Sequence, residues 1–210
     1  MKIKRGPKVL KQDLLGAQID SIWLADTQQI LFNSLMQAVS RPGRMDNWSK
    51  WLDNNPAYLA VLSTLLDGEV TLADVDGLLT ESKWPLLQAQ KSTAEQANYV
   101  LCDTTKAPTF SPKLGTLSSP DFAATLVLKV ASLDKAQGNI HLKLTGPGVK
   151  NETEAFVSGI DQAWLEHRNE WCSAFPMGID CILVDDTQIM ALPRTTKIEI
   201  LNVIEKGGLS

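Results

Sequence analysis

Cysteine and histidine are scarce in this sequence, and their scarcity excludes several classes of protein. The 210 residues include three cysteines and two histidines. Cys102, Cys172 and Cys181 form no Cys-x-x-Cys pair, so we predict neither a zinc knuckle nor a disulfide scaffold. His141 and His167 belong to no His-x-x-x-His pair, and we expect no metal site. The absence of a cysteine cluster also excludes an iron–sulfur centre.

Long apolar runs and nucleotide-binding glycine motifs are missing as well. The longest apolar stretches, such as 59–66 and 122–128, are much shorter than the roughly 18 residues of a membrane helix. The chain has no Gly-x-x-x-x-Gly-Lys-Ser/Thr run, and Gly146-Pro147-Gly148 lacks the third glycine of a dinucleotide-binding motif, which favours an ordinary turn. No apolar segment follows the basic N-terminus, as it would in a signal peptide. Together with the odd number of cysteines, these features predict a cytoplasmic protein.

Basic residues are concentrated at the N-terminus. Five of the 20 basic residues stand within the first eleven positions, where there is no acidic residue, while the chain as a whole has 24 acidic residues. We therefore predict that residues 1–13 are a basic tail, either solvated or acting as a weak, salt-sensitive arm. Residues 14–210 are acidic on balance, which makes them a poor nucleic-acid surface, and their number suits a single α/β domain.

The hydrophobic periodicity predicts interleaved helices and strands. Helices are expected from Asp26 or Thr27 to Pro42-Gly43, from Asn55-Pro56 to Gly68, and from about 158 to 172. Strands are expected at 70–72, 99–102, 125–130, 140–144, 179–184, 189–192 and 197–201. We predict a hairpin between the third and fourth of these strands, through Gly138-Asn139. For Asp185-Asp186 we favour a tight turn over an acid–base pair. The result is an α/β fold with a mixed sheet and helices on its faces.

Two loops carry residue types that bind phosphate or phosphonate oxygens. Arg41 and Arg44 flank a Pro-Gly turn at the end of a predicted helix. Arg194, Thr195 and Thr196 follow a predicted strand. Arginine forks and threonine hydroxyls suit anionic oxygens. For the first two arginines a helix-capping role is the alternative, and for the third it is an ion pair that fixes the last strand. We predict no catalytic residue.

Seven motifs, taken together and in order, resemble the H subunit of the bacterial carbon–phosphorus lyase core complex. They cover the chain from about residue 14 to 201. They are Gln29-x-x-Phe32-x-x-Leu35-Met36-x-Ala38, Arg41-Pro42-Gly43, Leu65-Leu66-Asp67, Pro120-x-x-x-Ala124-Thr125-Leu126, Leu144-Thr145-Gly146-Pro147-Gly148, Phe175-Pro176-x-Gly178-Ile179-Asp180-x-Ile182-Leu183 and Ala191-Leu192-Pro193-Arg194-Thr195-Thr196. The Phe-Pro-x-Gly-x-Asp and Pro-Arg-Thr-Thr segments make the match specific.

This resemblance implies a fold, a reaction and a set of partners. The implied fold is a three-layer α/β/α sandwich similar to type I pyridoxal-phosphate transferases, without their cofactor, and no other cofactor is implied. In the implied reaction of phosphonate catabolism, the triphosphoribosyl group of ATP passes to an alkylphosphonate and adenine is lost, giving ribose 1-methylphosphonate 5-triphosphate. The implied partners are the G, I, J, K and L subunits, with a homodimer when the H subunit is isolated. We expect Arg41, Arg44, Arg194, Thr195 and Thr196 to contact ATP or phosphonate.

Two other functions remain open from the sequence. A purely structural interaction module of the core complex, with no ligand contact, would use exposed aromatic residues as anchors. Trp48, Trp51 and Trp84 would suit such a surface because their segments show no core pattern. For most of the tryptophans, however, core packing is the favoured interpretation. A stand-alone enzyme of the transferase fold would be active as an isolated chain. The subunit and the interaction module would both be inactive alone.

Overall fold

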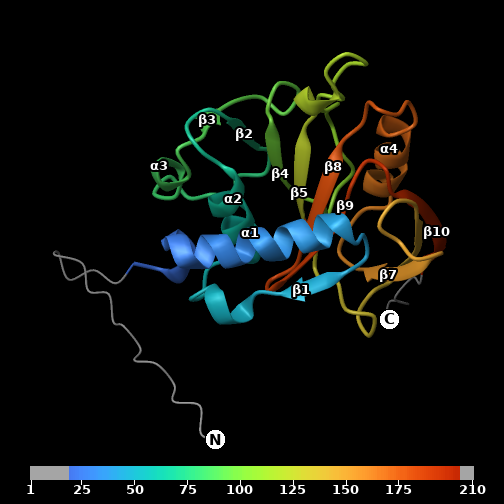
Figure 1. Cartoon of the computed structure of the whole chain (residues 1–210), viewed down its shortest axis with the longest axis horizontal. Helices are drawn as coiled ribbons and strands as arrows, with labels where there is room; N and C mark the ends of the chain where they lie inside the picture. The colour runs from blue at the N-terminus through green and yellow to red at the C-terminus, as the bar shows by residue number, and fades with distance from the viewer. Residues whose placement is uncertain (1–18, 204–210) are drawn as a thin grey trace, which may run out of the picture.

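The computed structural model describes residues 19–203, so the predicted basic tail and its boundary at residue 14 lie outside this range. The α-helices are α1 (Ala25–Ser40), α2 (Ala57–Leu65), α3 (Trp84–Leu87) and α4 (Ala163–Trp171). Short 3₁₀ helices are η1 (Ser21–Trp23), η2 (Ser49–Trp51) and η3 (Pro120–Phe122). The strands are β1 (Met45–Asn47), β2 (Thr71–Asp74), β3 (Gln90–Lys91), β4 (Tyr99–Asp103), β5 (Thr125–Lys129), β6 (Ile140–Thr145), β7 (Thr153–Val157), β8 (Asp180–Val184), β9 (Gln188–Leu192) and β10 (Lys197–Val203). Figure 1 shows how these elements are arranged.

A mixed seven-stranded sheet lies at the centre of the fold and confirms the predicted α/β class. Its strand order is β1-β9-β8-β5-β4-β2-β3. The strands β3, β2, β4, β5 and β8 are parallel, whereas β9 pairs antiparallel with both β8 and β1. The register aligns Tyr99 of β4 with Thr125 of β5 and Asp180 of β8. The amino-terminal ends of these three parallel strands therefore lie next to one another at one end of the sheet.

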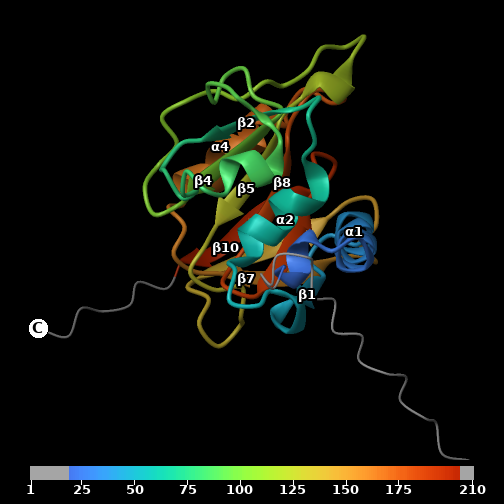
Figure 2. The same ribbon diagram turned by 90° about the vertical axis from the view of Figure 1, so that its left-hand side faces the viewer.

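Both faces of the large sheet are covered. On one face Leu101, Val127 and Ile182 pack in a core with α1 and α2. On the other face Val100 and Leu126 pack with α4 and with a three-stranded sheet of order β10-β6-β7. Figure 2 shows these two covering layers from the side. Strands buried on both faces are typical of parallel sheets, and here the layer on the second face combines a helix with a small sheet.

The helix α1 forms because apolar residues recur at helical spacing. Leu31, Leu35 and Ala38 are buried against the sheet. The helix ends at Ser40 because Pro42 disfavours helical geometry in the residue before it and has no N–H to donate. This confirms the first predicted helix and its end.

Most of the other predicted elements are confirmed within a few residues. The second predicted helix is α2, which begins directly after Pro56. The strands predicted at 70–72, 99–102, 179–184, 189–192 and 197–201 are β2, β4, β8, β9 and β10. The carboxylate of Asp185 accepts hydrogen bonds from the N–H groups of Thr187 and Gln188, which confirms the tight turn at Asp185-Asp186.

The predicted hairpin between 125–130 and 140–144 is wrong. The strand β5 pairs with β4 and β8 in the large sheet, whereas β6 pairs with β10 and β7 in the small one. The burial patterns give the physical reason. The three middle residues of β5 are all buried, as expected of a strand covered on both faces, while β6 alternates between buried and half-buried residues.

The predicted helix over 158–172 starts too early. Ser158 continues from β7 and forms an antiparallel bridge with Ser132. The carboxylate of Asp161 accepts a hydrogen bond from the N–H of Ala163 at 2.9 Å, which satisfies a free donor of the first helical turn. The helix α4 therefore begins at Ala163, and Trp164 in its first turn is buried in the core.

Trp48 is a core residue, in line with the core packing favoured for most of the tryptophans, although its own segment shows no core pattern. Its side chain is 0% exposed, and its indole N–H donates a hydrogen bond to the hydroxyl of Ser34 at 2.8 Å. Trp51 and Trp84 are half-buried and pack against the same core. Polar residues flank Trp48 on both sides, so no periodicity in the sequence indicates its burial.

The two histidines each lie beside a carboxylate. His141 Nε2 is 3.3 Å from Glu154, and His167 Nδ1 is 3.1 Å from Glu170. Among residues 19–203 there is no group of three or more His, Cys, Asp or Glu side chains that could hold a metal ion. None of the helices in this part of the chain has the length and apolar character needed to cross a bilayer.

Candidate functional site

The two predicted anion-binding loops lie on either side of a third turn. We name the two loops the α1 turn (residues 40–44) and the β9 turn (residues 193–196). The third turn, which follows β6, is the glycine turn (residues 146–148). The glycine turn contains the Gly-Pro-Gly sequence for which an ordinary turn was predicted. It touches both of the other turns.

Two glycines allow these turns to approach one another closely. A Cβ atom on Gly148 would lie 2.3 Å from the backbone oxygen of Ser40, in the α1 turn. One on Gly146 would lie 2.7 Å from the backbone oxygen of Thr195, in the β9 turn. Both glycines also have a positive φ, which side chains rarely allow. The glycine turn is thus the contact through which segments distant in sequence meet.

Arg194, in the β9 turn, is held by groups of its own chain. Its guanidinium donates hydrogen bonds to the carboxylate of Asp180, with Nη2 at 2.6 Å from Oδ2. Nη1 donates to the backbone oxygen of Pro120 at 2.6 Å. The backbone N–H of Arg194 also donates to Asp180 at 2.8 Å. This is the ion pair that the sequence offers as the alternative, and it ties the β9 turn to the start of β8 and to η3.

A second arginine, Arg168 of α4, lies beneath the β9 turn and was missed in the sequence. It is 3% exposed and donates hydrogen bonds to the backbone oxygens of Thr196 at 2.6 Å and of Pro193 at 2.5 Å. Its Nε and the hydroxyl of Thr196 are buried without a hydrogen-bond partner among the described residues. The sequence contains a signal for the burial of Arg168. This residue follows the core residue Trp164 by four positions and so lies on the apolar face of α4.

A groove of about 560 Å³ opens beside the β9 turn, within the range of small-molecule sites. Its walls are the end of α4, Phe175, Pro147 and residues 194–198. The charged side chains in this lining are Arg194 and Lys197, and none is acidic. We name this hollow the cationic groove. The structure thus brings three predicted site residues, Arg194, Thr195 and Thr196, into one wall.

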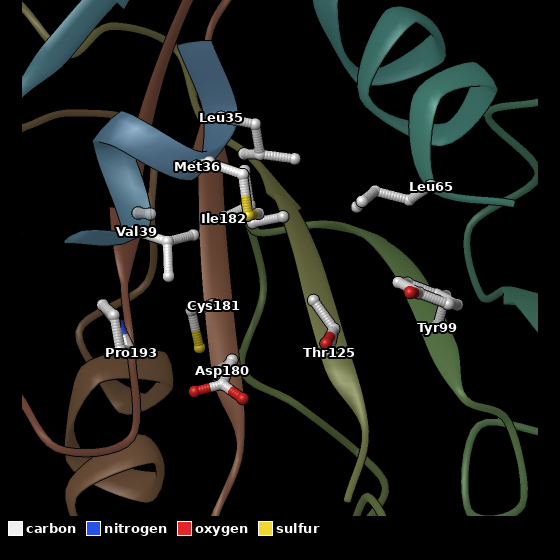
Figure 3. A pocket seen from close by; sticks show the side chains of 11 residues that line it. Leu35, Met36, Val39, Leu65, Tyr99, Thr125, Asp180, Cys181, Ile182 and Pro193 are labelled. Carbon is white, nitrogen blue, oxygen red and sulfur yellow. The ribbon is translucent and has the colours of Figure 1, made fainter. Parts of the chain in front are cut away.

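An apolar pocket of about 210 Å³ lies on the other side of the Arg194–Asp180 ion pair, at the amino-terminal ends of β4, β5 and β8. Figure 3 shows α1 on one side of this pocket, Leu65 and Tyr99 on the other, and the Asp180 carboxylate at one end. Asp180 is the charged residue in its lining. Because Asp180 lines the pocket and Arg194 lines the groove, their ion pair separates the two hollows.

The arginines of the α1 turn lie outside both hollows. Arg44 pairs with Asp46, with Nη2 at 2.9 Å from Oδ1, and the hydroxyl of Ser34 donates to the other oxygen of that carboxylate. Arg41 is exposed, and its backbone N–H donates to the oxygen of Ala38 at the end of the helix. The α1 turn therefore lies beside the site, across the glycine turn from the cationic groove.

Cys172 is expected to be the reactive thiol of the folded chain. Burial raises the pKa of Cys181 to about 12, and burial also raises the pKa of Cys102 well above its usual range, so both stay protonated at pH 8. Cys172 is only half-buried and lines the cationic groove. We expect iodoacetamide at pH 8 to modify Cys172 alone in the folded protein and all three cysteines in urea, as read by peptide mass spectrometry. Equal rates at Cys102 and Cys172 in the folded protein would contradict this.

The chain is similar to proteins of phosphonate metabolism. Residues 21–199 match the family model described as bacterial phosphonate metabolism protein (PhnH). A protein of Stutzerimonas stutzeri named as a C-P lyase subunit, HtxG, is 38% identical over 179 residues, which cover 85% of this chain and 89% of the relative. A protein of Rhizobium meliloti (strain 1021), named alpha-D-ribose 1-methylphosphonate 5-triphosphate synthase subunit PhnH, is 31% identical over 196 residues, 88% of this chain and 94% of the relative.

Proposed function

Because the chain belongs to the family of bacterial phosphonate metabolism proteins (PhnH), we propose that it is a subunit of a carbon–phosphorus lyase system that supports transfer of the triphosphoribosyl group of ATP to an alkylphosphonate. In this step a phosphonate oxygen bonds to C1′ of the ribose and the bond from C1′ to adenine breaks. Adenine leaves with the bonding electrons and takes up a proton. With methylphosphonate the product is ribose 1-methylphosphonate 5-triphosphate. The 31% identity to a relative named as a subunit of the synthase for this compound carries the proposal.

The site supports a role in binding rather than in proton transfer. The lining of the cationic groove contains hydroxyl, amide and cationic groups, but no histidine or carboxylate that could act as a general base. We therefore propose that the chain is inactive alone and that partner subunits supply the catalytic groups. Arg194, Thr195 and Thr196 stay the proposed ligand-contact residues in the cationic groove, with Arg194 and Thr196 also shaping the β9 turn. Arg41 and Arg44 stay proposed ligand contacts of the neighbouring α1 turn, outside the groove.

The proposed partners are the G, I, J, K and L subunits, in the cytoplasm, with a homodimer when the chain is isolated. A likeness of the fold to the three-layer type I pyridoxal-phosphate transferases, without their cofactor, belongs to the same proposal. A sheet of mainly parallel strands covered on both faces supports it.

Leaving this chain out of the transferase reaction is expected to abolish product. The assay combines ATP and methylphosphonate with the G, I and L subunits, with and without this chain. Adenine release is followed by liquid chromatography, and the phosphonate–ribose product by phosphorus NMR. Equal product in the two mixtures would contradict the proposal and would move the role of the chain to a later step or to assembly.

A purely structural interaction module is the second candidate function, and exposed apolar residues favour it. Leu117, Phe122 and Phe175 are 73%, 63% and 68% exposed, respectively. Phenylalanine is enriched in protein interfaces relative to the rest of the surface, so Phe122 and Phe175 are candidate anchors for a partner. A module of this kind would be required for the complex to assemble to its full mass. It would not be required for turnover by the G, I and L subunits. The same assay, with the complex mass measured in parallel, distinguishes the two functions.

A further inference from the structure

Beneath the cationic groove lies a buried positive charge that no acidic side chain of the described residues neutralises. Among residues 19–203, no carboxylate oxygen lies within 4.0 Å of a guanidinium nitrogen of Arg168, so this side chain forms no ion pair there. Its guanidinium contacts are the backbone oxygens of Pro193 and Thr196 and the side-chain oxygen of Asn169. Burying a charge is unfavourable unless an opposite charge lies near it. An anion in the adjacent groove would provide that opposite charge.

The walls of the groove offer groups that bind anionic oxygens. Lys197 is exposed, lines the groove, and takes part in none of the ion pairs found among the described residues. Thr195, in the β9 turn, adds a hydroxyl group to the same lining. Ammonium and hydroxyl donors of this kind suit phosphate oxygens. The lining therefore has donors for an anion and no acidic residue to repel it.

The two ends of the groove differ in character, which orients a ligand within it. The carboxyl-terminal end of α4, at Trp171, carries a partial negative charge from the helix dipole. Anionic groups are therefore favoured on the side of Thr195 and Lys197. Phe175 is 68% exposed on the groove wall and offers an aromatic face to an uncharged ring.

We infer that the cationic groove binds a polyphosphate ester through its phosphate chain, with Lys197 and Thr195 as contacts and Arg168 as the buried charge beneath them. The volume of about 560 Å³ accommodates more than one phosphate group together with the start of an organic part. The inference deepens the proposed function, on which it rests for the identity of the ligand as ATP or the ribosyl triphosphate product. The phosphate chain, rather than the base, is the part that this chain recognises.

Titration calorimetry on the full chain tests this with sodium tripolyphosphate, ATP and adenosine as probes. We expect tripolyphosphate and ATP to bind and adenosine not to bind. The substitution Lys197→Gln should weaken ATP binding about tenfold, the effect of losing one charge-assisted contact. Lys106→Gln is the matched control, because Lys106 is an exposed lysine near the opposite end of α4, where its backbone oxygen accepts the indole N–H of Trp164, and it should leave binding unchanged.

Protection of Cys172 gives an independent measurement. Since Cys172 lines the groove, bound ATP should slow its modification by iodoacetamide, and adenosine should not. Adenosine binding as tightly as ATP, or full ATP affinity in the Lys197→Gln variant, would overturn the inference. So would the absence of binding by both polyphosphates at millimolar concentration. If the chain is required for turnover but binds no polyphosphate, the groove inference alone fails. If polyphosphate binds but turnover needs no such chain, only the proposed function fails.

Discussion

Replacing Gly148 with alanine is expected to destabilise the fold by about 3 kcal/mol or more and to separate the α1 turn from the glycine turn. A left-handed backbone at a residue with a Cβ costs roughly 1–2 kcal/mol, and Gly148 has a φ of +81°. The added Cβ would also lie 2.3 Å from the oxygen and 3.1 Å from the carbonyl carbon of Ser40, which are backbone atoms that cannot rotate away. Urea denaturation followed by circular dichroism measures the loss.

Two other glycines provide matched controls for this prediction. Gly77 also has a positive φ of +67°, but a Cβ there would meet nothing within 4 Å, so Gly77→Ala measures the backbone strain alone, about 1 kcal/mol. Gly68 has neither a positive φ nor a neighbour within 4 Å, and Gly68→Ala should change stability by less than about 0.5 kcal/mol. If Gly148→Ala costs no more than Gly77→Ala, the close contact between the two turns is contradicted.

Replacing Arg168 with alanine is expected to cost about 3–5 kcal/mol of stability, because two hydrogen bonds from a charged group are lost and two backbone oxygens are left without that donor. The substitution also leaves a cavity beneath the β9 turn. The loss should appear as a lower denaturation midpoint in urea with an unchanged slope.

Variants at the same helix separate the charge of Arg168 from its geometry. Arg168→Lys keeps the positive charge but lacks the planar fork that reaches both the Pro193 and Thr196 oxygens, so it should recover only part of the lost stability. Glu170→Ala changes an exposed neighbour and should stay within about 0.5 kcal/mol of the unsubstituted protein. Full stability in Arg168→Ala would show that the β9 turn does not depend on this arginine.

Local sequence signals were sufficient for elements whose ends are marked by proline or glycine. The helix α1 ends before Pro42 and α2 begins after Pro56, because proline restricts the backbone around it wherever it occurs. Strand partners are not a local property. The turn signal at Gly138-Asn139 predicts that β6 pairs with the strand before it, whereas β6 pairs with β7, the strand after it, and with β10, more than fifty residues away.

The residues of the candidate site could be predicted from their chemical type, but the contacts that they make could not. The arginine and threonine residues of the β9 turn stood out because of their chemistry, and they do line one groove. The binding partner of Arg194 is Asp180, fourteen positions earlier on a neighbouring strand, and only the fold brings these two residues together. The burial of Arg168 depends on the packing of α4 beneath the β9 turn, which its own segment of sequence shows only weakly.

The pairing of β1 with β9 sets an order of events during synthesis of the protein. Asn47 of β1 lies opposite Gln188 of β9, near the other end of the chain. At ribosomal rates of about 5–20 residues per second, the roughly 140 residues between them take about 7–30 s to emerge. During that interval β1 has no neighbouring strand. The edge of the large sheet beside α1 can therefore close only after the residues up to Gln188 have left the ribosome, so completion of this edge comes late in folding.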